Sequence, residues 1–183
     1  THIQAFKKKH NLQSNHDLQT FMNIRLEKIL AKHGKSVMGW EEIMTDKMPT
    51  SALIHSWKGA NEGLTARSSL FAAAKKGYNT VLSNGYYIDL MQPVIEHYLV
   101  DPLPKNNNLS EIEKARVLGG EATMWSELAT KTTIDSRLWP RAAAIAERFW
   151  SSGDIVDVSS MYKRLDVVSF RLEELGITHI RNR

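Results

Sequence analysis

The chain has 183 residues, of which 42% are hydrophobic and 24% are charged, with a net charge of +4 and no cysteine. These values describe a globular chain large enough for one core, and no apolar run reaches the length of a membrane-spanning helix. The lack of cysteine excludes disulfides, thiol nucleophiles and cysteine metal ligands, but it leaves cytoplasm, periplasm and exterior all open.

The N-terminal part of the chain predicts helices. The densest basic cluster, residues 7–10 (Lys-Lys-Lys-His), lies within the first of them. Elsewhere Lys and Arg are scattered among Asp and Glu, so we interpret the cluster as a solvated helix face and expect no nucleic-acid partner. Apolar residues at a near-helical period from Leu18 to Leu30 predict a second helix, which ends at Gly34.

From residue 36 onward, short β-type runs alternate with helical patterns. We predict strands at 36–40, 52–57, 80–83 and 116–120, and helices at 62–76, 135–150 and 160–175. Strands without polar alternation that are joined by helices indicate an α/β fold with a parallel sheet covered on both faces. Two irregular stretches, 86–103 and 130–136, follow strand ends, where functional loops of such proteins lie.

The number of strands bears on the architecture. Four strands are too few for a closed barrel, and an open sheet of four would expose hydrophobic edges. An eight-stranded TIM-type (β/α)8 barrel cut in half gives this number and this length. We therefore expect residues 1–183 to form the second half of such a barrel. Its uncovered edges and inner face lead us to expect self-association or dependence on the missing half.

Tryptophans stand at the ends of three predicted strands, at Trp40, Trp57 and Trp125. In a parallel barrel these ends converge on one mouth, where ligands bind. A single tryptophan there would be an ordinary core residue, but three together favour an apolar box for a methyl group or a sugar face. Trp139 and Trp150 lie in or beside a helix, and we assign both to packing.

Polar side chains follow the same strand ends. Asp89 and Glu127 offer carboxylates that accept hydrogen bonds from hydroxyl groups, and Tyr86 or Tyr87 offers a phenolic donor. An apolar box with hydroxyl acceptors at its rim predicts a site for a neutral sugar.

Several segments together resemble, in the right order, the C-terminal half of the catalytic domain of glycoside hydrolase family 20, the β-N-acetylhexosaminidases. They are Gly39-Trp-Glu-Glu-Ile43, His55-Ser-Trp-Lys-Gly59, Leu82-Ser-Asn-Gly-Tyr-Tyr-Ile-Asp89, Gly119-Gly-Glu-Ala-Thr-Met-Trp-Ser-Glu127 and the helix residues 137–142 and 146–151. The resemblance implies a hydrolase with a carbohydrate partner, no cofactor, no metal and a periplasmic or secreted location. The chain starts at Thr1 without a signal-like segment, and we expect it to be a piece of a longer protein.

The resemblance also implies roles for individual residues. The walls of the pocket for the substrate's acetamido methyl would be Trp40, Trp57 and Trp125. Tyr87 would hydrogen-bond the acetamido carbonyl. Asp89 and Glu127 would hold the hydroxyls on the O4 and O6 side of a terminal N-acetylglucosamine or N-acetylgalactosamine.

The family's acid machinery is an adjacent Asp-Glu pair in a His-x-Gly-Gly-Asp-Glu motif on the fourth strand, and this sequence contains no Asp-Glu pair. Glu41-Glu42 follows Trp40 instead, where one of the two would orient the site, the alternative being a structural or solvated role. The Gly119-Gly120-Glu121 triplet belongs to the eighth strand. In relatives the pair would lie upstream of Thr1. We therefore expect a retaining, substrate-assisted reaction from the full-length protein and no activity from this chain alone.

The sequence also allows other interpretations of the predicted site. The aromatic mouth also fits a non-catalytic carbohydrate-binding module. A phosphate-binding barrel enzyme would need a longer glycine-rich turn than Asn84-Gly85. The seven histidines are dispersed, and His55 has no partner at ligand spacing, so we interpret it as a satisfied strand histidine rather than a metal ligand.

Overall fold

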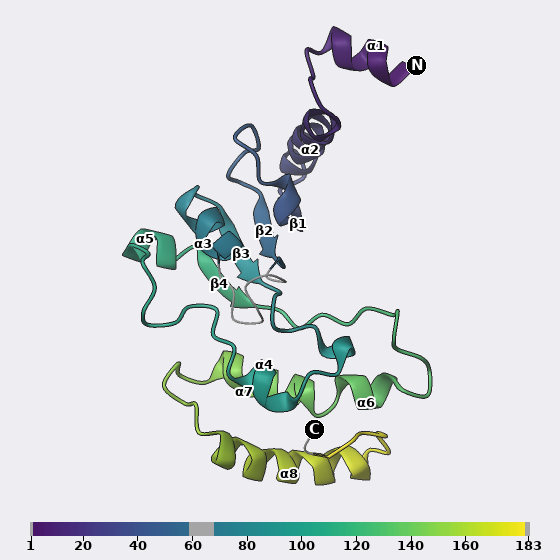
Figure 1. Cartoon of the computed structure of the whole chain (residues 1–183), viewed down its shortest axis with the longest axis vertical. Coiled ribbons are helices and arrows are strands. Elements are labelled where there is room, and N and C mark those ends of the chain that lie inside the picture. Colours follow the sequence, from purple (N-terminus) through teal and green to yellow (C-terminus); the bar gives the residue numbers. More distant parts are fainter. Residues whose placement is uncertain (1, 59–67, 182–183) are drawn as a thin grey trace.

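The chain contains a four-stranded parallel sheet (Figure 1), and the computed structural model describes residues 2–58 and 68–181. The strands are β1 (Met38–Trp40), β2 (Leu53–Ser56), β3 (Asn79–Leu82) and β4 (Val117–Gly120), and they lie side by side in that order. Each neighbouring pair is parallel. This arrangement confirms the predicted α/β fold built from parallel units, with each strand found within its predicted range or one residue beyond it.

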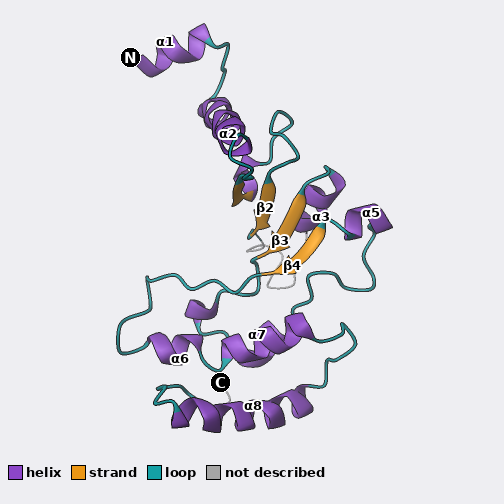
Figure 2. Ribbon diagram, turned by 180° about the vertical axis from the view of Figure 1, so that it is seen from behind, coloured by secondary structure: helices purple, strands orange, loops and turns teal. Residues whose placement is uncertain are grey.

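Helices lie beyond both ends of the sheet and beside it (Figure 1). They are α1 (His2–Lys9), α2 (Asn15–Ala31), α3 (Ser68–Lys75), α4 (Val94–Tyr98), α5 (Glu111–Lys114), α6 (Ile134–Leu138), α7 (Arg141–Trp150) and α8 (Val158–Glu174), with short 3-10 turns η1 (Glu41–Ile43) and η2 (Ile88–Leu90). Figure 2 shows α1 and α2 beyond one end of the sheet and α6, α7 and α8 beyond the other. None of the helices in the described residues is long and apolar enough to cross a membrane.

The helix boundaries follow local signals. Ser14 and Asp17 form a capping box that starts α2, and Gly34 takes a φ of +64° just after its end. The predicted helix at 62–76 is observed as α3 from Ser68, while its residues 62–67, like Gly59 of the strand-end motif, lie outside the described residues. The predicted helix at 135–150 is divided into α6 and α7, with Pro140 as the N-cap of α7.

One face of the sheet carries the core. Ile54 and Leu82 are completely buried on this face, in clusters with residues of α3, and Ile145 of α7 joins the cluster around Leu82. On its other side α7 packs through Ala144 against α4 and α8. Helix α7 therefore ties the sheet to the C-terminal helix layer.

The opposite face is less covered than predicted. Trp40 pairs in register with His55, and His55 with Val81, so these side chains share the face opposite Ile54. In the described part of the chain, the two buried clusters that include strand residues lie on the other face. For the residues that the structure describes, the prediction of a sheet covered on both faces is therefore wrong. In a (β/α)8 barrel, helices cover only the outer face, and side chains from the other strands fill the inside.

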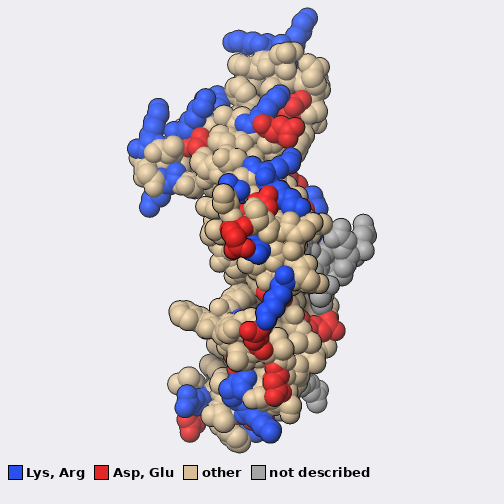
Figure 3. Space-filling model, turned by 90° about the vertical axis from the view of Figure 1, so that its left-hand side faces the viewer, with Lys and Arg blue, Asp and Glu red and all other residues tan. Residues whose placement is uncertain are grey.

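Two predictions concern the surface of the chain: the solvated basic cluster near the N-terminus and the packing of Trp139 and Trp150. The basic residues 7–9 lie on α1, and Figure 3 shows Lys and Arg mixed with Asp and Glu over most of one side, apart from the end that carries α1. Trp139 is partly buried, in agreement with a packing role. Trp150 is 90% exposed, so its assignment to packing is wrong for this chain: it closes α7 with its side chain outside the core.

Candidate functional site

Three indole rings meet at the carboxyl end of the sheet. The ring centroid of Trp40 lies 6.4 Å from that of Trp57 and 5.8 Å from that of Trp125. Trp40 ends β1, Trp57 follows β2, and Trp125 lies in the loop after β4, so convergent strand ends bring them together. Trp57 and Trp125 remain 40% and 42% exposed. The structure thus has the aromatic cluster that the sequence predicts, with one side open to solvent.

The two carboxylates after β1 hold Trp57 in place. The indole N–H of Trp57 donates to both carboxylate oxygens of Glu42 at 3.2 Å. Glu41, only 9% exposed, accepts the backbone N–H groups of Trp57 and Lys58 at 3.2 and 3.3 Å. Partial burial alone would raise the pKa of Glu42, but the hydrogen bonds it accepts, first from Lys58, lower it below its ordinary value. For the Glu41-Glu42 pair, these contacts support the predicted orienting role rather than the alternative of a structural or solvated role.

The phenolic donor after β3 is Tyr87. Tyr86 is completely buried, and its hydroxyl donates to the carbonyl of Val100 at 3.0 Å, so its role is structural. Tyr87 is only partly buried and pairs in a β-bridge with Thr123 of the loop that leads to Trp125. This bridge fixes the loop after β3 against the loop after β4, which places Tyr87 and Trp125 on neighbouring segments.

The surroundings of Tyr87 keep its hydroxyl protonated. Burial raises the pKa of Tyr87 to about 12, and the negative charges of Glu121 and Asp89 add to the effect. Burial disfavours the phenolate because a charged oxygen loses its hydration there, and nearby carboxylates repel it. Tyr87 is therefore a hydrogen-bond donor throughout the neutral pH range.

Asp89 lies close to Tyr87 and has unused acceptor capacity. It is 2% exposed, and among the described residues its Oδ1 has no hydrogen-bond donor. Its backbone carbonyl accepts from Arg137 at 3.1 Å, which fixes the loop that carries it. A buried carboxylate oxygen without a donor is costly, and a ligand hydroxyl is a group that can satisfy it. Glu127 is exposed in the loop after β4, and its position at the rim stays a prediction.

Glu121 is a site residue that sequence reasoning did not single out. It follows β4, and its Oε1 accepts hydrogen bonds from the Nδ1 of His55 and the hydroxyl of Ser83. The ring of His55 in turn packs 4.8 Å from that of Trp40. His55 is therefore a satisfied strand histidine, as predicted, and its partner is this carboxylate. The sequence feature that could have identified Glu121 is its position as a charged residue directly after a buried strand.

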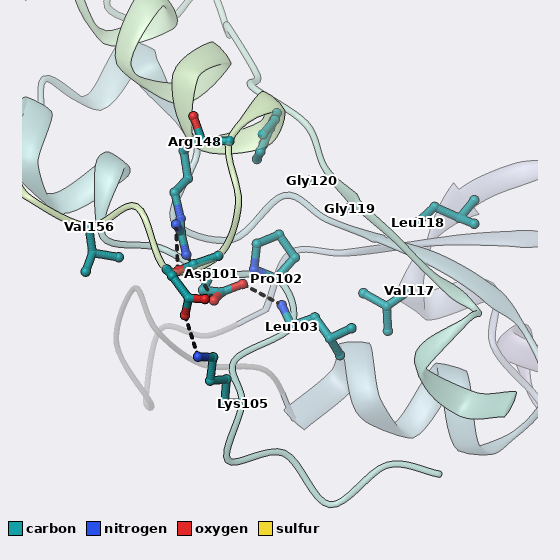
Figure 4. Close-up of a pocket in the computed structure, with 14 residues that line it drawn as sticks. Asp101, Pro102, Leu103, Lys105, Val117, Leu118, Gly119, Gly120, Arg148 and Val156 are labelled. Atoms are coloured by element: carbon teal, nitrogen blue, oxygen red, sulfur yellow. Dashed lines mark hydrogen bonds and ion pairs between the residues drawn. The ribbon is translucent and has the colours of Figure 1, made fainter. Parts of the chain in front are cut away.

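A separate cavity of about 570 Å³ lies away from the tryptophans, along β4 and the end of α7 (Figure 4). Its charged side chains are already paired: Arg148 with Asp101 at 3.0 Å, and Lys105 with Asp154. Leu118 on its wall is 55% exposed, although it belongs to a strand. The cavity thus adjoins a sheet edge, and its composition differs from that of the sugar site predicted at the strand ends.

Comparisons with known proteins agree with this geometry. Residues 1–153 match the glycosyl hydrolase family 20 catalytic domain. The solved structure of a chitobiase from Flavobacterium johnsoniae is 64% identical, with a TM-score of 0.89, over 98% of this chain and 28% of that chain. The β-hexosaminidase subunit beta of Mus musculus is 32% identical over 96% of this chain and 33% of the mouse protein.

A more distant solved structure is that of a mutant Streptomyces plicatus β-hexosaminidase in complex with its product, GlcNAc. It is 26% identical, with a TM-score of 0.73, over 90% of this chain and 36% of that chain. The chain therefore spans between 28% and 36% of the length of these three relatives.

Proposed function

The chain belongs to glycosyl hydrolase family 20, and from that premise we propose that it is the C-terminal part of the catalytic barrel of a β-N-acetylhexosaminidase. The complete enzyme removes terminal β-linked N-acetylglucosamine or N-acetylgalactosamine from glycans or chito-oligosaccharides. The observation that carries the proposal is the convergence of Trp40, Trp57 and Trp125 at the carboxyl end of the sheet.

The proposed pocket matches the polarity of the sugar. The indole cluster provides apolar walls for the acetamido methyl group, and the protonated Tyr87 donates a hydrogen bond to the acetamido carbonyl. Asp89 accepts a hydroxyl of the ring, because it is buried with an oxygen that lacks a donor among the described residues. Glu127, at the exposed rim, accepts a second hydroxyl.

The pocket supports a retaining, substrate-assisted reaction. The acetamido carbonyl oxygen attacks the anomeric carbon while the glycosidic bond breaks and the leaving oxygen takes a proton from a general acid. Water then opens the cyclic intermediate with retention. Holding the acetamido group in one orientation is the contribution of this chain, because a positioned internal nucleophile gains reactivity over a freely rotating one. The Asp-Glu pair for the acid step is absent from the 183 residues and comes from the N-terminal half of the barrel.

The same proposal assigns the free sheet edges to contacts with that other half. On β4, Leu118 is 55% exposed, and the adjacent α7 ends in Phe149 and Trp150, which are 36% and 90% exposed. Leu118 and Phe149 line the cavity of Figure 4 on an apolar side. An exposed apolar strand edge of this kind favours pairing with another strand.

The test is hydrolysis of p-nitrophenyl N-acetyl-β-glucosaminide by the purified complete protein and by residues 1–183 alone. We expect turnover by the complete protein and none by the chain alone. A complete protein that binds N-acetylglucosamine without hydrolysing any aryl N-acetylhexosaminide would instead support a non-catalytic carbohydrate-binding module. Activity of residues 1–183 alone would show that the acid group lies within this chain.

A further inference from the structure

A continuous line of contacts crosses the sheet from β4 to β1 on the face that carries the tryptophans. Glu121, directly after β4, contacts Ser83 after β3 and His55 on β2. The ring of His55 lies 4.8 Å from that of Trp40 on β1. The carboxylate of Glu121 thus links the ends of β4, β3 and β2 directly, and His55 extends the link to Trp40 of β1 in the indole cluster.

The backbone of β4 aims Glu121 at this face. The N–H of Glu121 donates to the carbonyl of Leu82 at 3.0 Å, which continues the pairing of β4 with β3. The preceding Gly120 lies against Phe149 and Tyr86 so tightly that a Cβ would come within 2.7 Å of each ring. Successive residues of a strand point to opposite faces, so Gly120 faces the buried helix side and Glu121 the other side.

The carboxylate is an acceptor for two donors at once. Both His55 Nδ1 and Ser83 Oγ contact the same oxygen, Oε1, of Glu121. An ionised carboxylate has no proton to donate, so it selects the tautomer of His55 with hydrogen on Nδ1 and fixes the hydroxyl of the completely buried Ser83. The imidazole is thereby held in one rotation against Trp40.

Trp40 is the central ring of the cluster, because it contacts both Trp57 and Trp125. We propose that Glu121 is a positioning residue that sets the width of the acyl pocket through His55 and Trp40, and so determines which N-acyl groups the enzyme accepts. This inference rests on the proposed function, because it takes the indole cluster as the pocket for the acetamido methyl group. One additional methylene in a tight apolar pocket changes kcat/KM by about 10- to 200-fold.

The experiment compares aryl β-glucosaminides that carry an N-acetyl or an N-propionyl group, using the complete enzyme. The measured quantity is the ratio of the two kcat/KM values. A variant that is merely less stable has less active enzyme, which lowers both values equally and leaves the ratio unchanged. The ratio therefore reports pocket width rather than folding.

For the wild type we expect a preference of at least about tenfold for the N-acetyl substrate. Glu121→Ala removes the acceptor and should reduce the preference to about threefold or less. Glu121→Gln keeps an Oε1 that accepts from both donors and should retain most of the preference for the N-acetyl substrate. Glu111→Gln, an exposed carboxylate on α5 paired with Lys114, is the matched control and should leave the ratio unchanged.

A double-mutant cycle separates this path from independent effects. His55→Ala should lower the ratio as Glu121→Ala does, and the double variant should lower it no further, because both changes release the same ring contact. The inference is wrong if Glu121→Ala keeps the wild-type ratio, or if Glu121→Gln lowers the ratio as much as Glu121→Ala does. It is also wrong if the effects of Glu121→Ala and His55→Ala on the ratio are additive. A wild-type enzyme without activity on the N-acetyl substrate would instead overturn the proposed function.

Discussion

The indole N–H of Trp57 donates to both carboxylate oxygens of Glu42 at 3.2 Å, which fixes the orientation of this ring in the cluster. Trp57 is 40% exposed and contacts the ring of Trp40, so the hydrogen bonds to Glu42 add a second restraint on its position. We expect Glu42→Leu in the complete enzyme to lower kcat/KM by roughly fivefold, the equivalent of about 1 kcal/mol for a lost hydrogen bond. Glu42→Gln keeps an acceptor and should lose less than about twofold, since an exposed ion pair with Lys58 contributes little.

A second prediction concerns the pH dependence of Tyr87. Burial raises the pKa of Tyr87 to about 12, so the phenol stays protonated and remains a donor up to about pH 11. With the ordinary phenol pKa of about 10, half the donors would already be lost at about pH 10. We expect Tyr87→Phe to lower kcat, and the ratio of wild-type to variant rates to stay constant from about pH 6 to about pH 10. A ratio that falls towards unity near pH 10 would contradict the raised pKa.

How much of this site the sequence could predict depends on how each residue is placed. Trp40 and Trp57 were predictable because they sit at the ends of parallel strands, which share one edge of the sheet. The pairing of His55 with Glu121 was not, because the two residues are 66 positions apart and neither local pattern names the other. Residue type alone left Tyr86 and Tyr87 as alternatives, because adjacent residues of one type do not reveal which is buried, and only the family resemblance named Tyr87.

Two narrower predictions, that both faces of the sheet are covered and that Trp150 packs in the core, failed for a related reason. A short apolar run shows that a strand is buried, but not whether helices or other strands cover its second face. The exposure of Trp150 has the same origin, because an aromatic residue at a helix end looks identical whether it packs within the chain or against something outside it. Sequence patterns therefore located the elements, while the partners of exposed apolar faces required the structure.

A third prediction tests Asp89 as the acceptor for a ring hydroxyl. Asp89→Ala should lower kcat/KM on the N-acetylglucosaminide by about 10- to 100-fold, the range for a lost hydrogen bond to a charged group in a buried site. The same change should matter far less for a substrate analogue that lacks the contacted hydroxyl at C4 or C6. Comparing the 4-deoxy and 6-deoxy analogues identifies which hydroxyl Asp89 binds. Equal losses on all three substrates would show that Asp89 supports the loop and does not touch the sugar.

A fourth prediction concerns the exposed strand edge. Residues 1–183 alone should self-associate, because Leu118 on β4 and Met38 on β1 are 55% and 49% exposed on strands at opposite edges of the sheet. Leu118→Lys places a charge on the edge and should shift the mass measured by light scattering towards the monomer. Lys163→Ala, an exposed change on α8, is the control and should leave the mass unchanged. A monomeric mass for the wild-type chain would show that these edges do not drive self-association.

The last prediction tests why β4 carries a glycine before Glu121. A Cβ at Gly120 would lie 2.7 Å from both Phe149 and Tyr86, closer than carbon atoms approach without displacement. Because Tyr86 is completely buried, its ring has little room to move, and we expect Gly120→Ala to destabilise the complete protein by about 1–3 kcal/mol. Gly153 is the matched control, since a Cβ there would meet nothing within 4 Å. Urea unfolding of Gly120→Ala and Gly153→Ala measures the difference, and equal midpoints would show that the two rings yield without cost. If Gly120→Ala also displaces Glu121, the preference for N-acetyl over N-propionyl substrates should fall together with the stability, whereas Gly153→Ala should change neither.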